Sequence, residues 1–257
     1  MKHGILFYDF ETTGLPACKT EREAIRMGNP FPPDPLARGN PLHYTQPFPV
    51  SVAMVLTDNT RQANIISETY TLIQLPPGVQ VQEGAAKIHG ISTEKANAEG
   101  APLASVLAHF IQLAHSATRP MAYNDNFDDT VLKANALRCG LISCPPPFSF
   151  PPYQISSCAL RQQLPGVFGT DHHKNLSYHA HMNDELYGPN SSSMCLMKLA
   201  SNFTRVPGGT DGFRTLKLGQ TFRRVCGIPM EAKYEAHNAL DDVRACVDIY
   251  RELVKVV

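Results

Sequence analysis

A short apolar run near the N-terminus that ends in acidic residues constrains this chain more than any other feature. Residues 4–10 (Gly-Ile-Leu-Phe-Tyr-Asp-Phe) predict a buried strand, and the turn residues Thr12-Thr13-Gly14-Leu15-Pro16 follow it. Along a strand, residues two apart point to the same face, so Asp9 and Glu11 present two carboxylates side by side. Unpaired carboxylates on a buried strand are costly, which favours a functional role for this pair over a solvated strand end.

The rest of the chain alternates predicted strands and helices around two irregular segments. Strands are predicted over 49–56, 65–75 and 119–123, with Asp58-Asn59 as a hairpin turn, and helices over 102–115, 126–140 (closed by Gly140), 214–226 and 238–256. Two insertions are predicted, at about 17–47 and 165–212, the second with a helix near 194–203. This order predicts a single α/β domain over residues 1–257.

Composition argues against several classes of protein. The 257 residues are 43% hydrophobic and 18% charged, so the chain can form a core without disulfides or a structural metal. The cysteines are scattered without a Cys-x-x-Cys pair, which argues against a disulfide framework and a thiolate zinc site. No apolar run approaches the roughly 18 residues of a membrane span, and the N-terminus does not resemble a signal peptide. We therefore expect no membrane association and a cytoplasmic location.

The formal net charge is zero, so the bulk electrostatics typical of a nucleic-acid binder are absent. A nucleic-acid substrate would then require a local positive groove. Arg214, Lys217, Arg223 and Arg224 fall on or near one predicted helix, where a solvated face is favoured over a phosphate-contacting stripe. A histidine cluster at 172, 173, 179 and 181 has no clear ligand spacing, which favours a solvated or substrate-contacting loop over a metal site.

Phosphodiester hydrolysis near neutral pH needs an activated water and a positive charge to offset the charge that builds on phosphorus. Two divalent cations about 4 Å apart supply both, and three or four carboxylates from different elements can hold them. Asp128 is a further candidate, although it also suits the N-terminal end of a helix dipole. His237 precedes the last predicted helix and is suited to accept a proton from water. Asp241 and Asp242, just inside that helix, compete as the last carboxylate.

Four segments resemble the DEDDh 3′→5′ exonucleases. Residues 7–15 (Phe-Tyr-Asp-Phe-Glu-Thr-Thr-Gly-Leu) resemble the first motif of that family, and residues 122–128 (Ala-Tyr-Asn-Asp-Asn-Phe-Asp) are similar to the second. The third motif resembles residues 237–243 (His-Asn-Ala-Leu-Asp-Asp-Val), and residues 85–92 (Ala-Ala-Lys-Ile-His-Gly-Ile-Ser) match a segment of the proofreading branch. Tyr123 stands where the second motif usually has histidine, a position that is not a metal ligand.

The resemblance implies a fold, a reaction and a set of residues. The fold would be ribonuclease H-like, with a mixed five-stranded sheet flanked by helices. Hydrolysis at single-stranded 3′ ends would release nucleoside monophosphates. The residues implied are Asp9, Glu11, Asp128 and Asp242 for two Mg²⁺ or Mn²⁺ ions, His237 as general base, and Thr12, Thr13, Leu15, His89 and Asn124 for the substrate. Leu15 would act as a wedge against the last base, and the spacing from His237 favours Asp242 over Asp241.

Two other functions remain open at this level. An RNA exonuclease similar to oligoribonuclease or RNase T would use the same residues, and a catalytically silent nucleic-acid-binding module would keep the fold alone. The presence of all four carboxylates and the histidine favours an enzyme. A polymerase or repair partner is compatible with the resemblance. The sequence leaves open the choice between DNA and RNA, the choice between single and double strands, and the oligomeric state.

Overall fold

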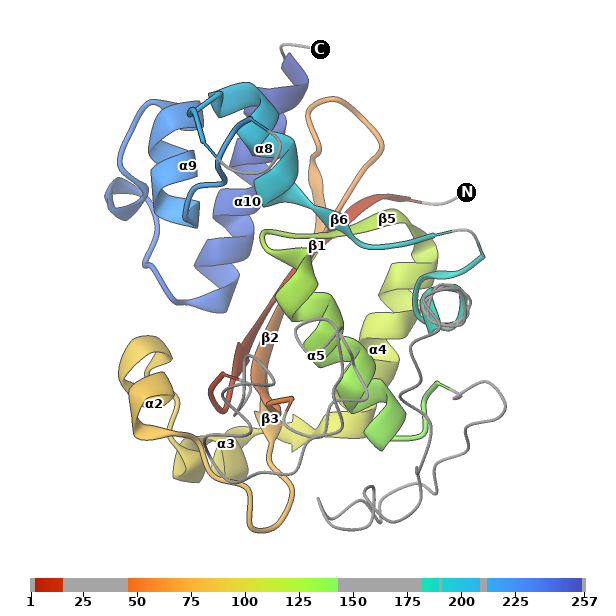
Figure 1. Cartoon of the computed structure of the whole chain (residues 1–257). Coiled ribbons are helices and arrows are strands. Elements are labelled where there is room, and N and C mark those ends of the chain that lie inside the picture. The colour runs from red at the N-terminus through yellow and green to blue at the C-terminus, as the bar shows by residue number, and fades with distance from the viewer. Residues whose placement is uncertain (1–2, 16–45, 143–181, 190, 209–211, 256–257) are drawn as a thin grey trace.

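The computed structural model describes residues 3–15, 46–142, 182–189, 191–208 and 212–255 (Figure 1). Within these ranges the chain forms a mixed six-stranded sheet in the order β4-β3-β2-β1-β5-β6. The strands are β1 (His3–Thr12), β2 (Pro49–Thr57), β3 (Ile65–Gln74), β4 (Ala101–Pro102), β5 (Ala117–Ala122) and β6 (Met194–Cys195). The predicted α/β architecture is confirmed. The sheet has six strands, one more than the five expected, and its two edge strands β4 and β6 are only two residues each.

The described helices flank this sheet. They are α2 (Glu83–His89), α3 (Thr93–Glu99), α4 (Leu103–Ser116), α5 (Asp125–Arg138), α8 (Leu196–Thr204), α9 (Leu218–Cys226), the short 3-10 helix η1 (Met230–Ala232) and α10 (Ala239–Lys255). The helices α4, α5, α8, α9 and α10 were all predicted. Helices α2 and α3 were not, because α2 buries no residue and α3 buries only Ala96, so neither has a clear apolar stripe.

Two predicted helix boundaries were wrong by a few residues. Helix α5 ends at Arg138, and Gly140 takes a left-handed φ of 64° in the turn that follows. Helix α9 begins at Leu218 instead of residue 214, because Lys217 is the extended N-cap and its backbone N–H donates to the side chain of Gln220.

Strand β1 is central and separates two hydrophobic clusters. It pairs antiparallel with β2 and parallel with β5. Leu6, Tyr8 and Phe10 point to the face covered by α4 and α5, whereas Phe7 points to the face covered by α8, α9 and α10 (Figure 1). Because side chains alternate along a strand, Asp9 lies on the same face as Phe7, beneath α10.

The parts of the chain that were predicted to be irregular fall largely outside the described ranges. Most of 17–47, the first part of 165–212 and the whole histidine cluster lie there. The described part of the second segment is more regular than expected: a helical stretch spans 182–187, and β6 leads into α8, which confirms the helix predicted near 194–203. The assignment of residues 1–257 to one domain stays a prediction.

Candidate active site

Three of the four predicted carboxylates meet between the central strand and the last helix. Asp9 and Glu11 lie two residues apart on β1, and Asp242 lies in the first turn of α10, which packs against β1 and β2. Carboxylate oxygens of the three residues lie within 4.8 Å of one another. All three side chains are half-buried, so they form an acidic cluster that is open to solvent on one side. We call Asp9, Glu11 and Asp242 the carboxylate cluster.

Asp128, the fourth predicted carboxylate, lies beside the cluster without joining it. It is only 4% exposed, and its Oδ1 accepts the backbone N–H of Phe10 at 3.1 Å. The parallel pairing of β1 with β5 runs only to Phe7 opposite Met121, after which the chain leaves the sheet and enters α5. The first turn of α5 therefore lies beside β1 at the point where β5 has ended. Asp128 accepts the backbone N–H of Phe10, which lies beyond the residues that pair with β5.

Burial and mutual repulsion raise the pKa values of the carboxylate cluster and of Asp128. Burial, followed by the charge of Glu11, raises the pKa of Asp9 to about 8. Burial and Asp242 raise the pKa of Glu11 to about 7, while burial and Asp9 raise that of Asp242 to about 8. For Asp128, burial and the charge of Asp9 raise the pKa well above its usual range. Such a group of hard oxygen donors is stabilised in its charged form by a divalent cation.

These pKa shifts predict how the metal-free protein responds to pH. Between about pH 4 and pH 8 the folded protein holds protons on Asp9 and Asp242 that the unfolded chain releases, so its free energy of unfolding falls as pH rises. Asp9→Asn removes one of these charges and should stabilise the metal-free protein by several kcal/mol (roughly 1.4 kcal/mol per pH unit across this window) at pH 8, and by clearly less at pH 5. Thermal unfolding in EDTA at both pH values measures this difference. A difference between the two proteins that does not grow with pH would contradict the predicted shifts.

The two neighbouring aspartates of α10 take different positions. Asp242 faces the cluster, whereas the Asp241 carboxylate accepts Arg244 Nη1 at 2.9 Å and the backbone N–H of Glu235 at 3.0 Å. The preference for Asp242, which rested on spacing from His237, therefore agrees with the geometry.

His237 lies at the edge of the cluster, just before α10. Its side chain is exposed, and its backbone N–H donates to the Asp242 carboxylate. It adopts a φ of 63°, a left-handed conformation that is uncommon for residues other than glycine. Strained backbone of this kind persists when neighbouring contacts hold it, and it occurs most often at functional sites.

The turn after β1 is held firmly by backbone contacts. Thr13 N–H donates to Phe48 O at 2.8 Å, and Gln82 N–H donates to Thr13 O at 2.8 Å. Gly14 has a φ of 153°, a backbone conformation that residues with a side chain rarely adopt, so a substitution there would strain the turn. Leu15 then projects outward with 57% of its surface exposed.

His89 supports the same turn. Its Nδ1 accepts the N–H of Ile91 at 3.1 Å, so Nε2 carries the proton and donates to Thr12 O at 3.1 Å. Burial lowers the pKa of His89, the hydrogen bond to Thr12 partly offsets this, and the nearby His237 lowers it further, which favours the neutral ring. Both ring nitrogens are engaged with backbone, which places this predicted substrate residue behind the turn.

In the second motif, Asn124 lies at the surface and Tyr123 contacts the start of α9. Asn124 is the exposed N-cap of α5, and its side chain makes no capping hydrogen bond. The hydroxyl of Tyr123 donates to Leu216 O at 2.6 Å and lies 2.6 Å from Thr221 Oγ1. Tyr123 thus anchors the start of α9 instead of facing the carboxylate cluster. Arg214, Lys217, Arg223 and Arg224 are all exposed.

Cysteine pairing and helix length are two further features of the described residues. Within the described part of the chain, Cys195, Cys226 and Cys246 form no disulfide. Among the described residues, every helix is too short or too polar to cross a lipid bilayer.

Solved structures with a similar fold are exonucleases. Exonuclease I from Methylocaldum szegediense has a TM-score of 0.59 and 17% identity over 98% of this chain. E. coli Exonuclease I in complex with a dT13 oligonucleotide has a TM-score of 0.54 and 19% identity over 96% of this chain. The zinc-bound form of the E. coli ExoI–ssDNA complex has a TM-score of 0.57 and 18% identity over 100% of this chain. The ribonuclease H-like fold is thereby confirmed.

This chain spans only 40% of the first two of these structures and 41% of the third. No curated protein matches the chain. Residues 6–185 match the RNase_T family, described as "Exonuclease", and these residues include the first two motifs and the His89 segment. Since this match covers more than half of the chain, the protein belongs to the RNase_T exonuclease family.

Proposed function

We propose that this protein is a metal-dependent 3′→5′ exonuclease that removes nucleoside monophosphates from single-stranded nucleic-acid ends. The observation that carries the proposal is the carboxylate cluster, in which Asp9, Glu11 and Asp242 converge from β1 and α10 with oxygens within 4.8 Å of one another. Membership of the exonuclease family supports the same reaction class.

The residues present fit divalent cation binding, and two ions are proposed. All the available donors are carboxylate oxygens, which suit Mg²⁺ or Mn²⁺. Burial, together with the repulsion among the carboxylates, raises the pKa values of Asp9 and Asp242, and a bound cation would offset both effects. Asp9, Glu11 and Asp242 would hold one ion, and Asp128 with Asp9 would hold the second. When bound, such ions activate a water molecule and stabilise the charge that develops on the phosphate.

His237 is proposed as the general base. His237 is exposed and its backbone lies beside Asp242, so its imidazole could accept a proton from a water molecule bound at the carboxylate cluster. The backbone hydrogen bond from His237 to Asp242 ties the position of the base to that of a metal ligand.

The turn after β1 is proposed to hold the terminal nucleotide. Thr12 and Thr13 are buried and fixed by backbone contacts, and Leu15 offers an exposed apolar side chain against which a terminal base can pack. His89 contributes by holding Thr12, and Asn124 offers a free amide at the N-terminus of α5. Single-stranded DNA is the proposed substrate because Exonuclease I, which shares the fold, is seen in complex with a DNA oligonucleotide.

The proposal is tested by digesting matched DNA and RNA 20-mers, single- and double-stranded, labelled at the 5′ end, with Mn²⁺ or EDTA. We expect a ladder that shortens from the 3′ end on single-stranded DNA in Mn²⁺ and no cleavage in EDTA. Faster digestion of RNA would assign the RNA exonuclease function instead. Tight binding without cleavage of any substrate would identify a silent binding module.

A further inference from the structure

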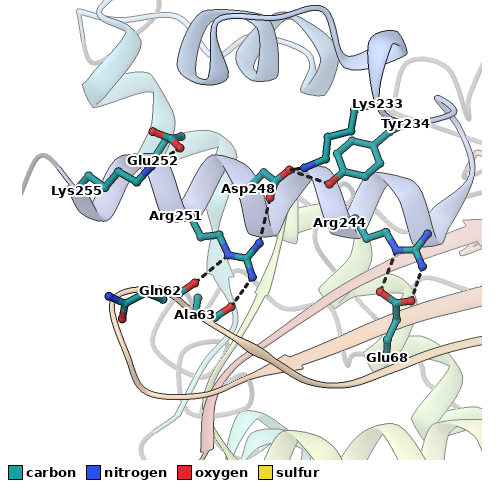
Figure 2. Close-up of polar contacts among 10 residues, drawn as sticks. All are labelled: Gln62, Ala63, Glu68, Lys233, Tyr234, Arg244, Asp248, Arg251, Glu252 and Lys255. Atoms are coloured by element: carbon teal, nitrogen blue, oxygen red, sulfur yellow. Dashed lines mark hydrogen bonds and ion pairs between the residues drawn. The ribbon is translucent and has the colours of Figure 1, made fainter.

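The connection between α9 and α10 carries His237 and is tied to neighbouring elements at both of its ends. At its first end, Asp248 Oδ2 accepts Lys233 Nζ at 2.5 Å and the Tyr234 hydroxyl at 2.7 Å (Figure 2). At its second end, Asn238 Oδ1 accepts the backbone N–H of Leu240 at 3.2 Å and caps α10. His237 is exposed between these anchors.

A chain of ionic contacts connects the middle of this segment to the sheet. Arg244 binds Glu68 on β3 through two nitrogens, with Nε at 2.9 Å from Oε2 (Figure 2). Its third nitrogen, Nη1, donates to Asp241 Oδ1 at 2.9 Å. The other oxygen of Asp241 accepts the N–H of Glu235 at 3.0 Å. A continuous path therefore runs from β3 through Arg244 and Asp241 to the backbone two residues before His237.

The geometry of Arg244 suits this bridging role. A guanidinium offers donors in a fixed planar fork, so one side chain can bind two carboxylates at a defined angle, which lysine cannot do. Glu68 fixes one edge of the fork to the sheet, and Asp241 transfers that position to the loop. One carboxylate oxygen of Asp241 binds Arg244 and the other binds the backbone N–H of Glu235. Without Arg244, the carboxylate would be able to rotate away from Glu235.

We propose that Glu68, Arg244 and Asp241 form a positioning relay that fixes His237 against the carboxylate cluster. This inference rests on the proposed function, because the relay matters for turnover only if His237 accepts the proton. None of the three residues is placed among the metal ligands or the substrate contacts. His237 has a left-handed backbone conformation, which persists only when neighbouring contacts hold it. The relay supplies such contacts on one side of His237.

The test compares Arg244→Ala and Glu68→Gln with a matched control, Arg251→Ala. Arg251 lies two turns further along α10 and donates to the carbonyl oxygens of Gln62 and Ala63 on the β2–β3 hairpin (Figure 2). It also donates to Asp248 Oδ1 at 3.2 Å, so this control removes one contact of Asp248 and leaves the contacts among Glu68, Arg244 and Asp241 in place. We expect Arg244→Ala to lower kcat by about 10- to 100-fold, with unchanged KM and Mn²⁺ affinity, because the base is displaced. Glu68→Gln, at an exposed site that should not disturb folding, should lower kcat in the same direction. Arg251→Ala should turn over like the unmodified protein.

Two further measurements separate positioning from general stability. Amide hydrogen exchange at Glu235 and His237 should accelerate in Arg244→Ala and stay unchanged in Arg251→Ala. In a His237→Ala background, Arg244→Ala should cause no further loss of kcat, since its effect passes through the imidazole. Unchanged exchange in Arg244→Ala, or a full additional loss in the double variant, would overturn the relay. Without any nuclease activity the proposed function fails, and hydrogen exchange alone then decides whether the relay orders the segment.

Discussion

Asp9→Asn and Asp242→Asn should each lower exonuclease turnover on single-stranded DNA by about 10³-fold or more, because several kcal/mol of transition-state stabilisation is lost with the cations. Asn keeps the size of the side chain but removes the charge that a divalent ion needs. Both residues contribute oxygens to the 4.8 Å cluster, and Asp9 also influences Asp128, so its loss weakens both proposed ion positions. Initial rates of mononucleotide release in saturating Mn²⁺ measure the effect.

The matched control for this prediction is Glu252→Gln on the same helix. Glu252 pairs with Lys255 near the end of α10, and this substitution also removes one negative charge. Its turnover should equal that of the unmodified protein. If Asp9→Asn retained more than about a tenth of the normal rate, a loss below the 1.4 kcal/mol that tenfold represents, the cluster could not be the metal centre.

His237→Ala should lower turnover by about 10²- to 10⁴-fold, the usual contribution of a positioned general base. The contact from His237 to Asp242 uses the backbone N–H, which alanine also has, so the cluster should keep its geometry. Metal affinity and binding of a DNA 20-mer should therefore stay within about threefold of normal, a change of less than 1 kcal/mol. Single-turnover rates with fluorescence binding assays distinguish the two effects. A variant with near-normal turnover would remove His237 from the role of base.

The sequence was most informative where local pattern and chemistry agree. The apolar run at 4–10 predicted β1 because a short apolar run that ends in Asp9 and Glu11 is typical of a buried strand, and Leu6, Phe7 and Tyr8 are all buried in β1. The spacing from His237 favoured Asp242 over Asp241, and the first turn of α10 directs Asp242 toward β1 and Asp241 toward Arg244. Features of this kind depend on residues close together in the sequence, so the sequence alone can predict them.

Features that depend on distant pairing could not be predicted in the same way. Glu68 and Arg244 are 176 residues apart, and each alone is an ordinary charged residue on a strand or helix. The engagement of both His89 nitrogens with backbone depends on how α2 docks against the turn at Thr12, and α2 itself has no apolar stripe. The dependence of Asp128 on the N–H of Phe10 likewise follows from where β5 ends.

Calorimetric titration of Mn²⁺ tests the carboxylate cluster most directly, with Asp242→Asn and Asp241→Asn as a matched pair of neighbouring substitutions. Asp242 belongs to the cluster, whereas Asp241 is bound to Arg244 and Glu235. We predict two bound ions in the unmodified protein and in Asp241→Asn, and the loss of at least one ion in Asp242→Asn. Unchanged Mn²⁺ binding in Asp242→Asn, or no Mn²⁺ binding by the unmodified protein, would contradict the proposed metal centre.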